Sequence, residues 1–328
     1  MRIWGVLLAA ALGAAGTVNA QTYADRTETR EFMVEMVKRH GFKQRELERL
    51  FAQARFEPSI ITLMTPAVPG TRSWQSYRAN FVNQHRIDAG VEFWRQHARV
   101  LLRAFDTYGV PPEIVVAIIG VETQYGRNVG GYRVLDALAT LAFDYPPRAD
   151  YFRSELEQFL LFARESHLDA TNLRGSYAGA IGIPQFMPGT IRRYGIDFDH
   201  DGRRDLQASA ADAIGSVANF LASHGWIPGA PVAFPAQVSG ERYRLVADGG
   251  VEPVYRAEEL RELDVAFDES VPADMTSVLI ELESPDAAPE YVVGLQNFYV
   301  LTRYNRSSFY AAVVCELAAA VKTAYRAH

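Results

Sequence analysis

The stretch of sequence that decides the fold is residues 111–126, which read PPEIVVAIIGVETQYG. The two prolines and Glu113 predict the start of a helix, because proline fits the first helical turn and an acid there faces the positive end of the helix dipole. Residues 114–121 are almost all apolar. A helix that is apolar on every side is buried in the core. We therefore expect a helix that begins at these prolines and lies inside the protein.

Glu122 follows the apolar run directly. A carboxylate beside such a wall loses hydration, which raises its pKa. A carboxylic acid that stays protonated near neutral pH can act as a general acid. Gly120 and Gly126, on either side of Glu122, have no side chains, which predicts room for a bulky substrate. The alternative is an ordinary glutamate at a helix end, either solvated or paired with an arginine.

A second segment, residues 175–190, reads GSYAGAIGIPQFMPGT and is dense in small residues. Glycines there allow a ligand to approach the backbone closely. Ser176 and Gln185 are the main polar residues, and the Gln185 amide suits a directed hydrogen bond to a sugar acetamide or hydroxyl. Taken alone, such a segment is equally typical of a turn-rich connection.

Together, residues 121–126 and 176–188 resemble the membrane-bound lytic transglycosylase B family of bacterial cell-wall enzymes. The resemblance continues through residues 197–226 and 297–310, and it covers most of the chain from about Trp74 onward. It implies a mainly α fold: a lysozyme-like helical core, joined to an additional helical domain and a small β-rich subdomain.

The resemblance also implies a reaction. Family members cut the β-1,4 bond between N-acetylmuramic acid and N-acetylglucosamine in peptidoglycan without adding water. Their single glutamate matches Glu122, first as general acid on the leaving oxygen and then as base on the muramic C6 hydroxyl, which closes a 1,6-anhydro ring. A glycoside hydrolase normally needs two carboxylates about 5–10 Å apart. The matching segments offer one obvious acid, and Asp144, Asp150 and Glu165 stay open as a second.

Supporting residues follow from the same resemblance. Phe220 stands where some relatives have a tyrosine, so one hydroxyl is missing from the expected site. The alternative for each tyrosine is a buried side chain whose hydroxyl is bonded within the protein. The residues that match substrate-contact positions are Ser176, Gln185, Tyr304, Asn305, Tyr310 and Tyr77.

Residues 197–205, DFDHDGRRD, match the start of an EF-hand loop. Acids stand at positions 1, 3, 5 and 9, and glycine stands at position 6. Position 12 is Ala208, where a regular loop has a bidentate glutamate; the family has a longer loop, which makes Asp212 the candidate closing ligand. The alternative is a solvated acidic turn in which Ser209 and Asp212 cap the next helix. We predict a structural Ca²⁺ and no cofactor for catalysis, with the ligands Asp197, Asp199, Asp201, the Arg203 carbonyl, Asp205 and Asp212.

Periodicity organises the remainder of the chain. Helical spacing or capping predicts helices over residues 27–40, 42–54, 83–108, 134–143, 149–167, 210–224 and 308–325. Short β-prone runs at 243–246, 277–282 and 291–301 predict the small β subdomain. The predicted domains are a helical domain over 21–109, a catalytic core over 110–230, a β-rich subdomain over 231–303, and a C-terminal helix over 304–328 that packs back on the helical part.

The first twenty residues are predicted to be a cleaved secretory signal. Arg2 precedes an apolar run at 3–16, and Val18 and Ala20 stand at the −3 and −1 positions. No cysteine lies near the cut to take a lipid, so we expect an exported, periplasmic protein without a transmembrane anchor after cleavage. The alternative is a retained anchor, although the run is shorter than the roughly 20 residues that span a bilayer.

Composition limits the partners. The chain has 328 residues, 48% of them hydrophobic, and a formal charge of −6. This is typical of a soluble globular protein of about two domains and does not favour nucleic acid. The single cysteine, Cys315, excludes an intramolecular disulfide and a multi-thiolate zinc site. The expected partners are peptidoglycan glycan strands and proteins of cell-wall synthesis.

Three functional hypotheses follow. The leading one is a lytic transglycosylase that acts on peptidoglycan. The first rival is a muramidase of the same fold, which would leave reducing ends. The second is a non-catalytic peptidoglycan-binding scaffold, which would tolerate Glu122→Gln.

Overall fold

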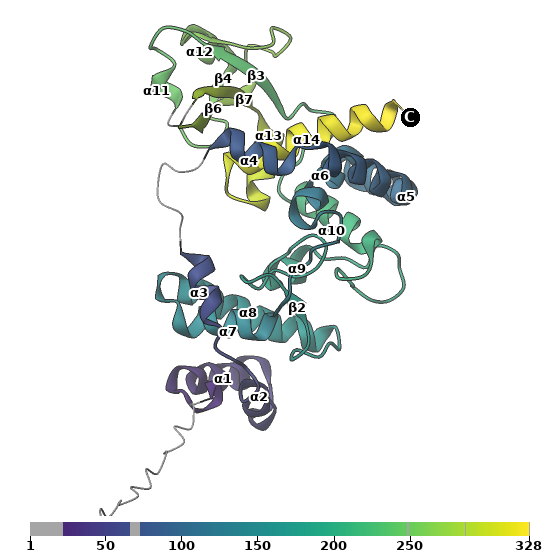
Figure 1. Cartoon of the computed structure of the whole chain (residues 1–328), viewed down its shortest axis with the longest axis vertical. Coiled ribbons are helices and arrows are strands. Elements are labelled where there is room, and N and C mark those ends of the chain that lie inside the picture. Colours follow the sequence, from purple (N-terminus) through teal and green to yellow (C-terminus); the bar gives the residue numbers. More distant parts are fainter. Residues whose placement is uncertain (1–21, 66–72, 248, 286, 328) are drawn as a thin grey trace, which may run out of the picture. The chain divides into compact units, whose positions relative to one another are not determined.

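The computed structural model describes residues 22–65, 73–247, 249–285 and 287–327 (Figure 1). The signal sequence predicted at 1–20 lies outside these ranges. The described chain forms two compact units, which divide at Arg55 and Phe56.

The first unit is a small helical hairpin. A 3₁₀ turn, Tyr23–Asp25, precedes α1 (Thr27–His40) and α2 (Gln44–Phe51). Gly41 ends α1 in a left-handed conformation, and the helix predicted over residues 27–40 is confirmed. The rings of Phe32 and Phe51 meet edge to face at 5.9 Å between centroids, and both are buried.

The second unit is built around α6 (Pro112–Thr123), the helix predicted from the quoted stretch. Residues 114–120 are all buried, as expected for a helix that is apolar all round. It packs against α5 (Gln84–Tyr108), α10 (Ala210–Ser223) and α14 (Ser308–Arg326). Figure 1 shows α5, α6 and α14 gathered near the C-terminus. The short helices α4 (Trp74–Phe81) and α13 (Gln296–Tyr304) pack against α14.

A further group of helices carries the small-residue segment. It consists of α7 (Val134–Asp144), a 3₁₀ turn (Pro146–Arg148), α8 (Ala149–Glu165) and α9 (Pro188–Tyr194), with α3 (Pro58–Met64) packed on α7. The antiparallel strands β1 (Tyr132–Arg133) and β2 (Arg174–Gly175) connect the start of α7 to the segment. The loop of residues 176–187 therefore begins directly after a strand that is hydrogen-bonded to β1, so its first residues are held in place.

The β-rich subdomain is a five-stranded antiparallel sheet in the order β4-β6-β7-β3-β5. Its core contains Val246, Leu260, Val265, Leu279, Val293 and Leu295. The short helices α11 (Arg244–Ala247) and α12 (Ala257–Glu262) accompany it. The strands are β3 (Ala233–Val238), β4 (Tyr255–Arg256), β5 (Val265–Ala266), β6 (Thr276–Ser284) and β7 (Ala287–Gly294). The predicted fold class, mainly α with a small β subdomain, is confirmed.

One of the three β-prone runs was predicted wrongly, and a second was right only in its first residues. Residues 243–246 lie mostly in α11, because Tyr243, Val246 and Ala247 share the spacing of one helix face that packs on the sheet. Residues 291–301 are split: β7 ends at Gly294, and α13 then places Phe298, Leu301 and Thr302 on one buried side. Short apolar runs fit either period, and the packing partner decides between them.

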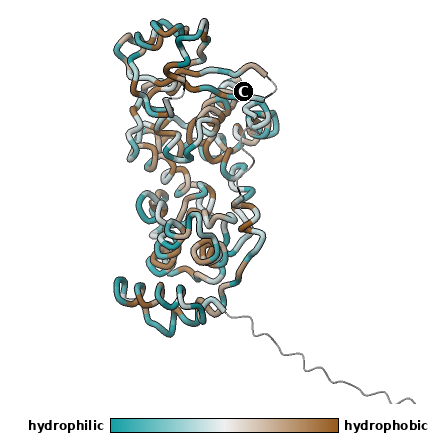
Figure 2. Tube along the Cα trace, turned by 90° about the vertical axis from the view of Figure 1, so that its left-hand side faces the viewer, coloured by the Kyte–Doolittle hydropathy of each residue, from teal (hydrophilic) through white to brown (hydrophobic). Residues whose placement is uncertain are grey.

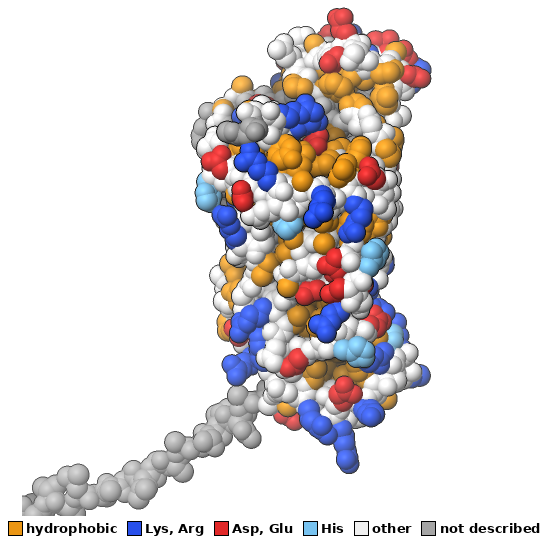
Figure 3. Space-filling view, turned by 90° about the vertical axis from the view of Figure 1, so that its right-hand side faces the viewer, with side chains coloured by type: hydrophobic (Ala, Val, Ile, Leu, Met, Phe, Trp, Pro, Cys, Tyr) orange, Lys and Arg blue, Asp and Glu red, His pale blue; other side chains and the backbone are white. Residues whose placement is uncertain are grey.

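Hydrophobic and hydrophilic residues occur together in many of the helices (Figure 2). In the part of the chain that the structure describes, no single helix combines the length and apolar character needed to cross a membrane; one pair, α5 with α6, passes that test only jointly and is bent by 114°. On the face in Figure 3, lysine and arginine side chains are interspersed with acidic ones and do not form a field of one sign.

Candidate active site

Glu122 leaves the last turn of α6 half-buried. Its Oε1 accepts a hydrogen bond of 2.8 Å from the hydroxyl of Tyr310. Burial raises the pKa of Glu122 to about 7, and the bond from Tyr310 opposes that rise. Near neutral pH the side chain therefore populates both its acid and its carboxylate form, as a group that gives and then takes a proton requires.

Two tyrosines stand beside this carboxyl. Tyr310 lies on α14 and is 1% exposed, and its ring stacks at 6.1 Å on that of Tyr304, the last residue of α13. The hydroxyl of Tyr304 donates to the carbonyl of Pro184 at 2.6 Å. Burial and the charge of Glu122 both raise the pKa of these phenols well above 10. Both hydroxyls consequently stay protonated and serve as donors.

The small-residue segment brings Gln185 and Ser176 to half-buried positions. Gln185 has a left-handed backbone, and its amide nitrogen donates to the carbonyls of Val129 (3.1 Å) and Gly182 (2.9 Å). The Ser176 hydroxyl accepts from the amide of Ala180 at 3.0 Å. Both polar groups thus shape the loop itself. The Tyr304–Pro184 bond brings the neighbour of Gln185 to the tyrosines, whereas the hydroxyl of Ser176 bonds within its own loop.

The other predicted contact residues differ in position. Tyr77 lies on α4, with its ring 5.8 Å from that of Phe309, and its charge is among the groups that raise the pKa of Tyr310. Asn305 follows α13 with an exposed side chain. Phe220 is buried at 5.0 Å from the Tyr304 ring. The site thus collects Glu122, Tyr304 and Tyr310 closely, with Tyr77 near them.

Sequence reasoning missed the turn that follows Glu122. Tyr125 is folded back, and its hydroxyl donates to the carbonyl of Arg86 at 2.8 Å. The space beside Gly120, which we predicted for substrate, is filled by this phenol: a Cβ at Gly120 would lie 2.6 Å from the Tyr125 hydroxyl. That prediction was wrong for Gly120, because the hydrogen bond to Arg86, 39 residues earlier in the chain, holds the Tyr125 side chain back against α6.

The acidic loop gathers three carboxylates. Oxygens of Asp197, Asp199 and Asp212 lie within 4.8 Å of one another. Asp212 is buried, and its oxygens accept from the amides of Phe198 (2.7 Å) and Asp205 (2.8 Å). The alternative prediction holds only for Ser209, which caps α10 by accepting from the amide of Asp212. Hard carboxylate oxygens at this density are the donor set that Ca²⁺ prefers.

Other predicted ligands lie in the same loop. Asp201 Oδ1 accepts from the amide of Arg203 at 2.8 Å, and Asp205 Oδ1 accepts from the amides of Gln207 and Ala208, both at 2.9 Å. These contacts order the loop backbone.

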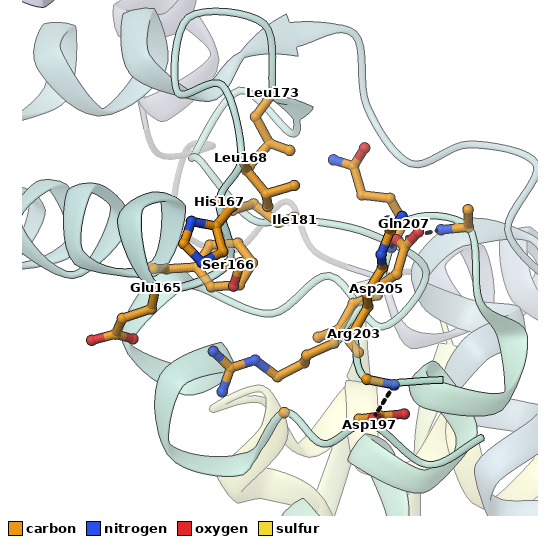
Figure 4. A pocket seen from close by; sticks show the side chains of 16 residues that line it. Glu165, Ser166, His167, Leu168, Leu173, Ile181, Asp197, Arg203, Asp205 and Gln207 are labelled. Carbon is orange, nitrogen blue, oxygen red and sulfur yellow. Dashed lines mark hydrogen bonds between the residues drawn. The ribbon is translucent and has the colours of Figure 1, made fainter. Parts of the chain in front are cut away.

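A cavity of about 840 Å³ lies beside the loop (Figure 4). Glu165 stands across it from Asp197 and Asp205. Glu165 forms two hydrogen bonds with Arg192, at 3.0 and 2.7 Å, and these lower its pKa. An acid held ionised in this way is a poor proton donor. Glu165 also lines a cavity whose lining residues do not include Glu122.

Among the described residues, the groups that shift the pKa of Glu122 do not include another carboxylate: the causes are burial and the bond from Tyr310. Asp144 ends α7, and Asp150 lies exposed in the first turn of α8. Glu155 has a raised pKa through burial, but its carboxylate accepts from the amide of Gly189 at the start of α9. The described residues thus offer one carboxyl, Glu122, beside the two tyrosines.

A family model described as "Transglycosylase SLT domain" matches residues 24–319 of the chain. The chain belongs to this transglycosylase family. The family and the enzyme class predicted from the sequence, a lytic transglycosylase, are confirmed.

Relatives of this transglycosylase cover nearly its whole length. It is 40% identical to the membrane-bound lytic murein transglycosylase B of Escherichia coli K12 over 311 residues. This match covers 92% of this chain and 84% of the E. coli protein. The soluble lytic transglycosylase SltB1 of Pseudomonas aeruginosa is 45% identical, with a TM-score of 0.86, over 91% of this chain and 99% of that one. The E. coli lytic transglycosylase Slt35, solved in complex with calcium, is 40% identical, with a TM-score of 0.85, over 94% and 98%.

Proposed function

We propose that this transglycosylase cleaves the β-1,4 bond between N-acetylmuramic acid and N-acetylglucosamine in peptidoglycan and leaves 1,6-anhydro ends. The observation that carries the proposal is Glu122: a carboxyl with a pKa of about 7 that is bonded to Tyr310, and whose pKa no second carboxylate shifts among the residues that the structure describes. The murein substrate named for the E. coli relative supports the choice of polymer.

In the first step, protonated Glu122 gives its proton to the glycosidic oxygen. The bond from C1 of the muramic sugar to that oxygen breaks, and the electron pair leaves with the N-acetylglucosamine. The substrate's own acetamide stabilises the positive charge left at C1. The hydroxyl of Tyr310 stabilises the new Glu122 carboxylate, because a donor to an ionised acceptor forms a strong hydrogen bond.

In the second step, the Glu122 carboxylate takes the proton of the muramic C6 hydroxyl, and the C6 oxygen bonds to C1. The anhydro ring closes, Glu122 is protonated again, and no water is consumed. One carboxyl performs both transfers, for which a pKa near the working pH is suited.

Binding of the glycan is assigned to polar and aromatic groups around this carboxyl. Aromatic faces suit the apolar faces of sugar rings, and amides and hydroxyls bond to sugar hydroxyls. Tyr304 and Tyr310 present protonated phenols within the site. The proposed contact residues are Ser176, Gln185, Tyr304, Asn305, Tyr310 and Tyr77.

The acidic loop is proposed to hold a structural Ca²⁺, which would neutralise its crowded carboxylates. The clustering of Asp197, Asp199 and Asp212 supports this, as does the calcium complex of the E. coli relative. Asp201, Asp205 and the Arg203 carbonyl complete the proposed ligand set. We also propose that the protein is exported to the periplasm, on the signal sequence predicted at residues 1–20.

Mass spectrometry of products from purified peptidoglycan tests the proposal. Muropeptides one water lighter than hydrolysis products, without a reducing end, are expected, and Glu122→Gln is expected to bind glycan without turnover. Reducing-end products would instead establish a muramidase. Binding without products from the unaltered protein would establish a scaffold.

A further inference from the structure

Three consecutive residues after Glu122 and Thr123 have left-handed backbones. The φ angle is 50° at Gln124, 63° at Tyr125 and 83° at Gly126. This conformation is unfavourable for residues other than glycine, so the surrounding structure has to hold it. Because the turn begins where α6 ends, its geometry sets the position of the last helical turn, which carries Glu122.

The phenol of Tyr125 ties this turn to α5. Its hydroxyl donates to the carbonyl of Arg86 at 2.8 Å, and its ring lies 5.6 Å from that of Phe93. In return, the Arg86 guanidinium donates to the carbonyl of Gly120, two residues before Glu122. The chain on both sides of Glu122 is therefore bonded to the same residue of α5.

A defined slot receives the phenol. A Cβ at Gly90 of α5 would lie 2.5 Å from the Tyr125 hydroxyl, and a Cβ at Gly120 of α6 would lie 2.6 Å from it. The two packed helices α5 and α6 thus each have a glycine where the phenol of Tyr125 lies between them. Any other residue there would have to displace Tyr125.

The far side of the turn is held independently. The hydroxyl of Thr123 donates to the carbonyl of Ile183 at 2.8 Å and accepts from the amide of Gly126 at 3.0 Å. Thr123 fixes the turn to the small-residue segment, and Tyr125 fixes it to α5. The Glu122 carboxyl itself is bonded to neither side chain but to Tyr310 on α14.

We propose that Tyr125 is a positioning residue for Glu122: by anchoring the left-handed turn to α5, it keeps the carboxyl against Tyr310 and shielded from water. The proposal rests on the proposed function in that Glu122 is the acid. The titratable groups that face Glu122 are Tyr310 and Tyr304, and the charged groups that face the phenol of Tyr125 are Arg86 and Arg127.

Tyr125→Phe removes one oxygen atom and tests the proposal. We expect kcat on peptidoglycan to fall about tenfold with KM nearly unchanged, the size that loss of one positioning hydrogen bond produces. We also expect the Glu122 carboxyl, followed by ¹³C NMR of labelled glutamate, to titrate at a lower pH as water reaches it, and the alkaline limb of kcat to move down with it.

Tyr145→Phe is the matched control. The Tyr145 hydroxyl donates to the carbonyl of Met64 at 3.2 Å, so the variant loses the same kind of bond in the same unit, away from Glu122. It should lower the thermal midpoint about as much as Tyr125→Phe while leaving kcat and the Glu122 titration unchanged.

Wild-type kcat and titration in Tyr125→Phe would overturn the proposal, as would an equal loss of activity in Tyr145→Phe. If Glu122→Gln proved active, the proposed function would fail, yet the Glu122 titration in Tyr125→Phe would still decide the positioning role.

Discussion

Replacing Glu122 with glutamine should stabilise the protein at alkaline pH. An unfolded chain ionises this carboxyl near its ordinary pKa of 4.5, whereas the folded chain holds the proton up to about 7. Between these values the folded state binds more protons than the unfolded state, so stability falls as the pH rises. Well above pH 7 the carboxylate is ionised in both states, and its burial lowers the free energy of unfolding by the full amount.

The structure sets the size of that cost. The two pKa values differ by about 2.5 units, and each unit corresponds to about 1.36 kcal/mol, which gives about 3 kcal/mol. Glutamine has the same shape, and its oxygen can still accept the hydrogen bond from Tyr310. Glu122→Gln should therefore raise the free energy of unfolding by about 3 kcal/mol at pH 8 and by close to nothing at pH 4.

Urea unfolding of both proteins at pH 4, 6 and 8 measures this difference, with the exposed Glu252→Gln as control. The control should change little at any of the three pH values. A gain that was equal at pH 4 and pH 8, or a loss at pH 8, would refute the reasoning that burial keeps Glu122 protonated. The test does not depend on activity, so it examines the electrostatics of the site by themselves.

Three further predictions follow from the same contacts. Tyr310→Phe removes the donor to the Glu122 carboxylate, so the pKa of Glu122 should rise further and the alkaline limb of the pH–rate profile should move up equally, as rate measurements from pH 5 to 10 would show. Gly120→Ala should cost about 1–3 kcal/mol of stability in urea unfolding, because the added carbon meets the Tyr125 hydroxyl at 2.6 Å; an unchanged midpoint would mean that the slot is not tight. Removing Ca²⁺ with a chelator should lower the thermal midpoint of the native protein and leave that of Asp212→Asn nearly unchanged, and equal shifts in both would place the metal elsewhere.

The sequence predicted much of the fold because strong, long patterns leave few alternatives. The apolar run at 114–121 became the buried helix α6, and the helical spacing over 27–40 became α1. Short runs failed where two periods fit them: residues 243–246 became a helical turn because its face packs on the β subdomain. The position of Glu122 at the end of an apolar helix was readable from local sequence alone.

The sequence by itself determined the central helix, the candidate acid at its end and the acidic loop, because each depends on residues that are neighbours in the chain. Only the tertiary structure decided what surrounds that acid. Tyr310 stands 188 residues from Glu122, and the carbonyl that anchors Tyr125 belongs to a residue 39 positions before it. Such contacts leave no periodic signal, because packing between helices, rather than spacing along one of them, brings the groups together. The same packing takes Glu122 out of water, and that desolvation gives an ordinary carboxyl a pKa near neutrality.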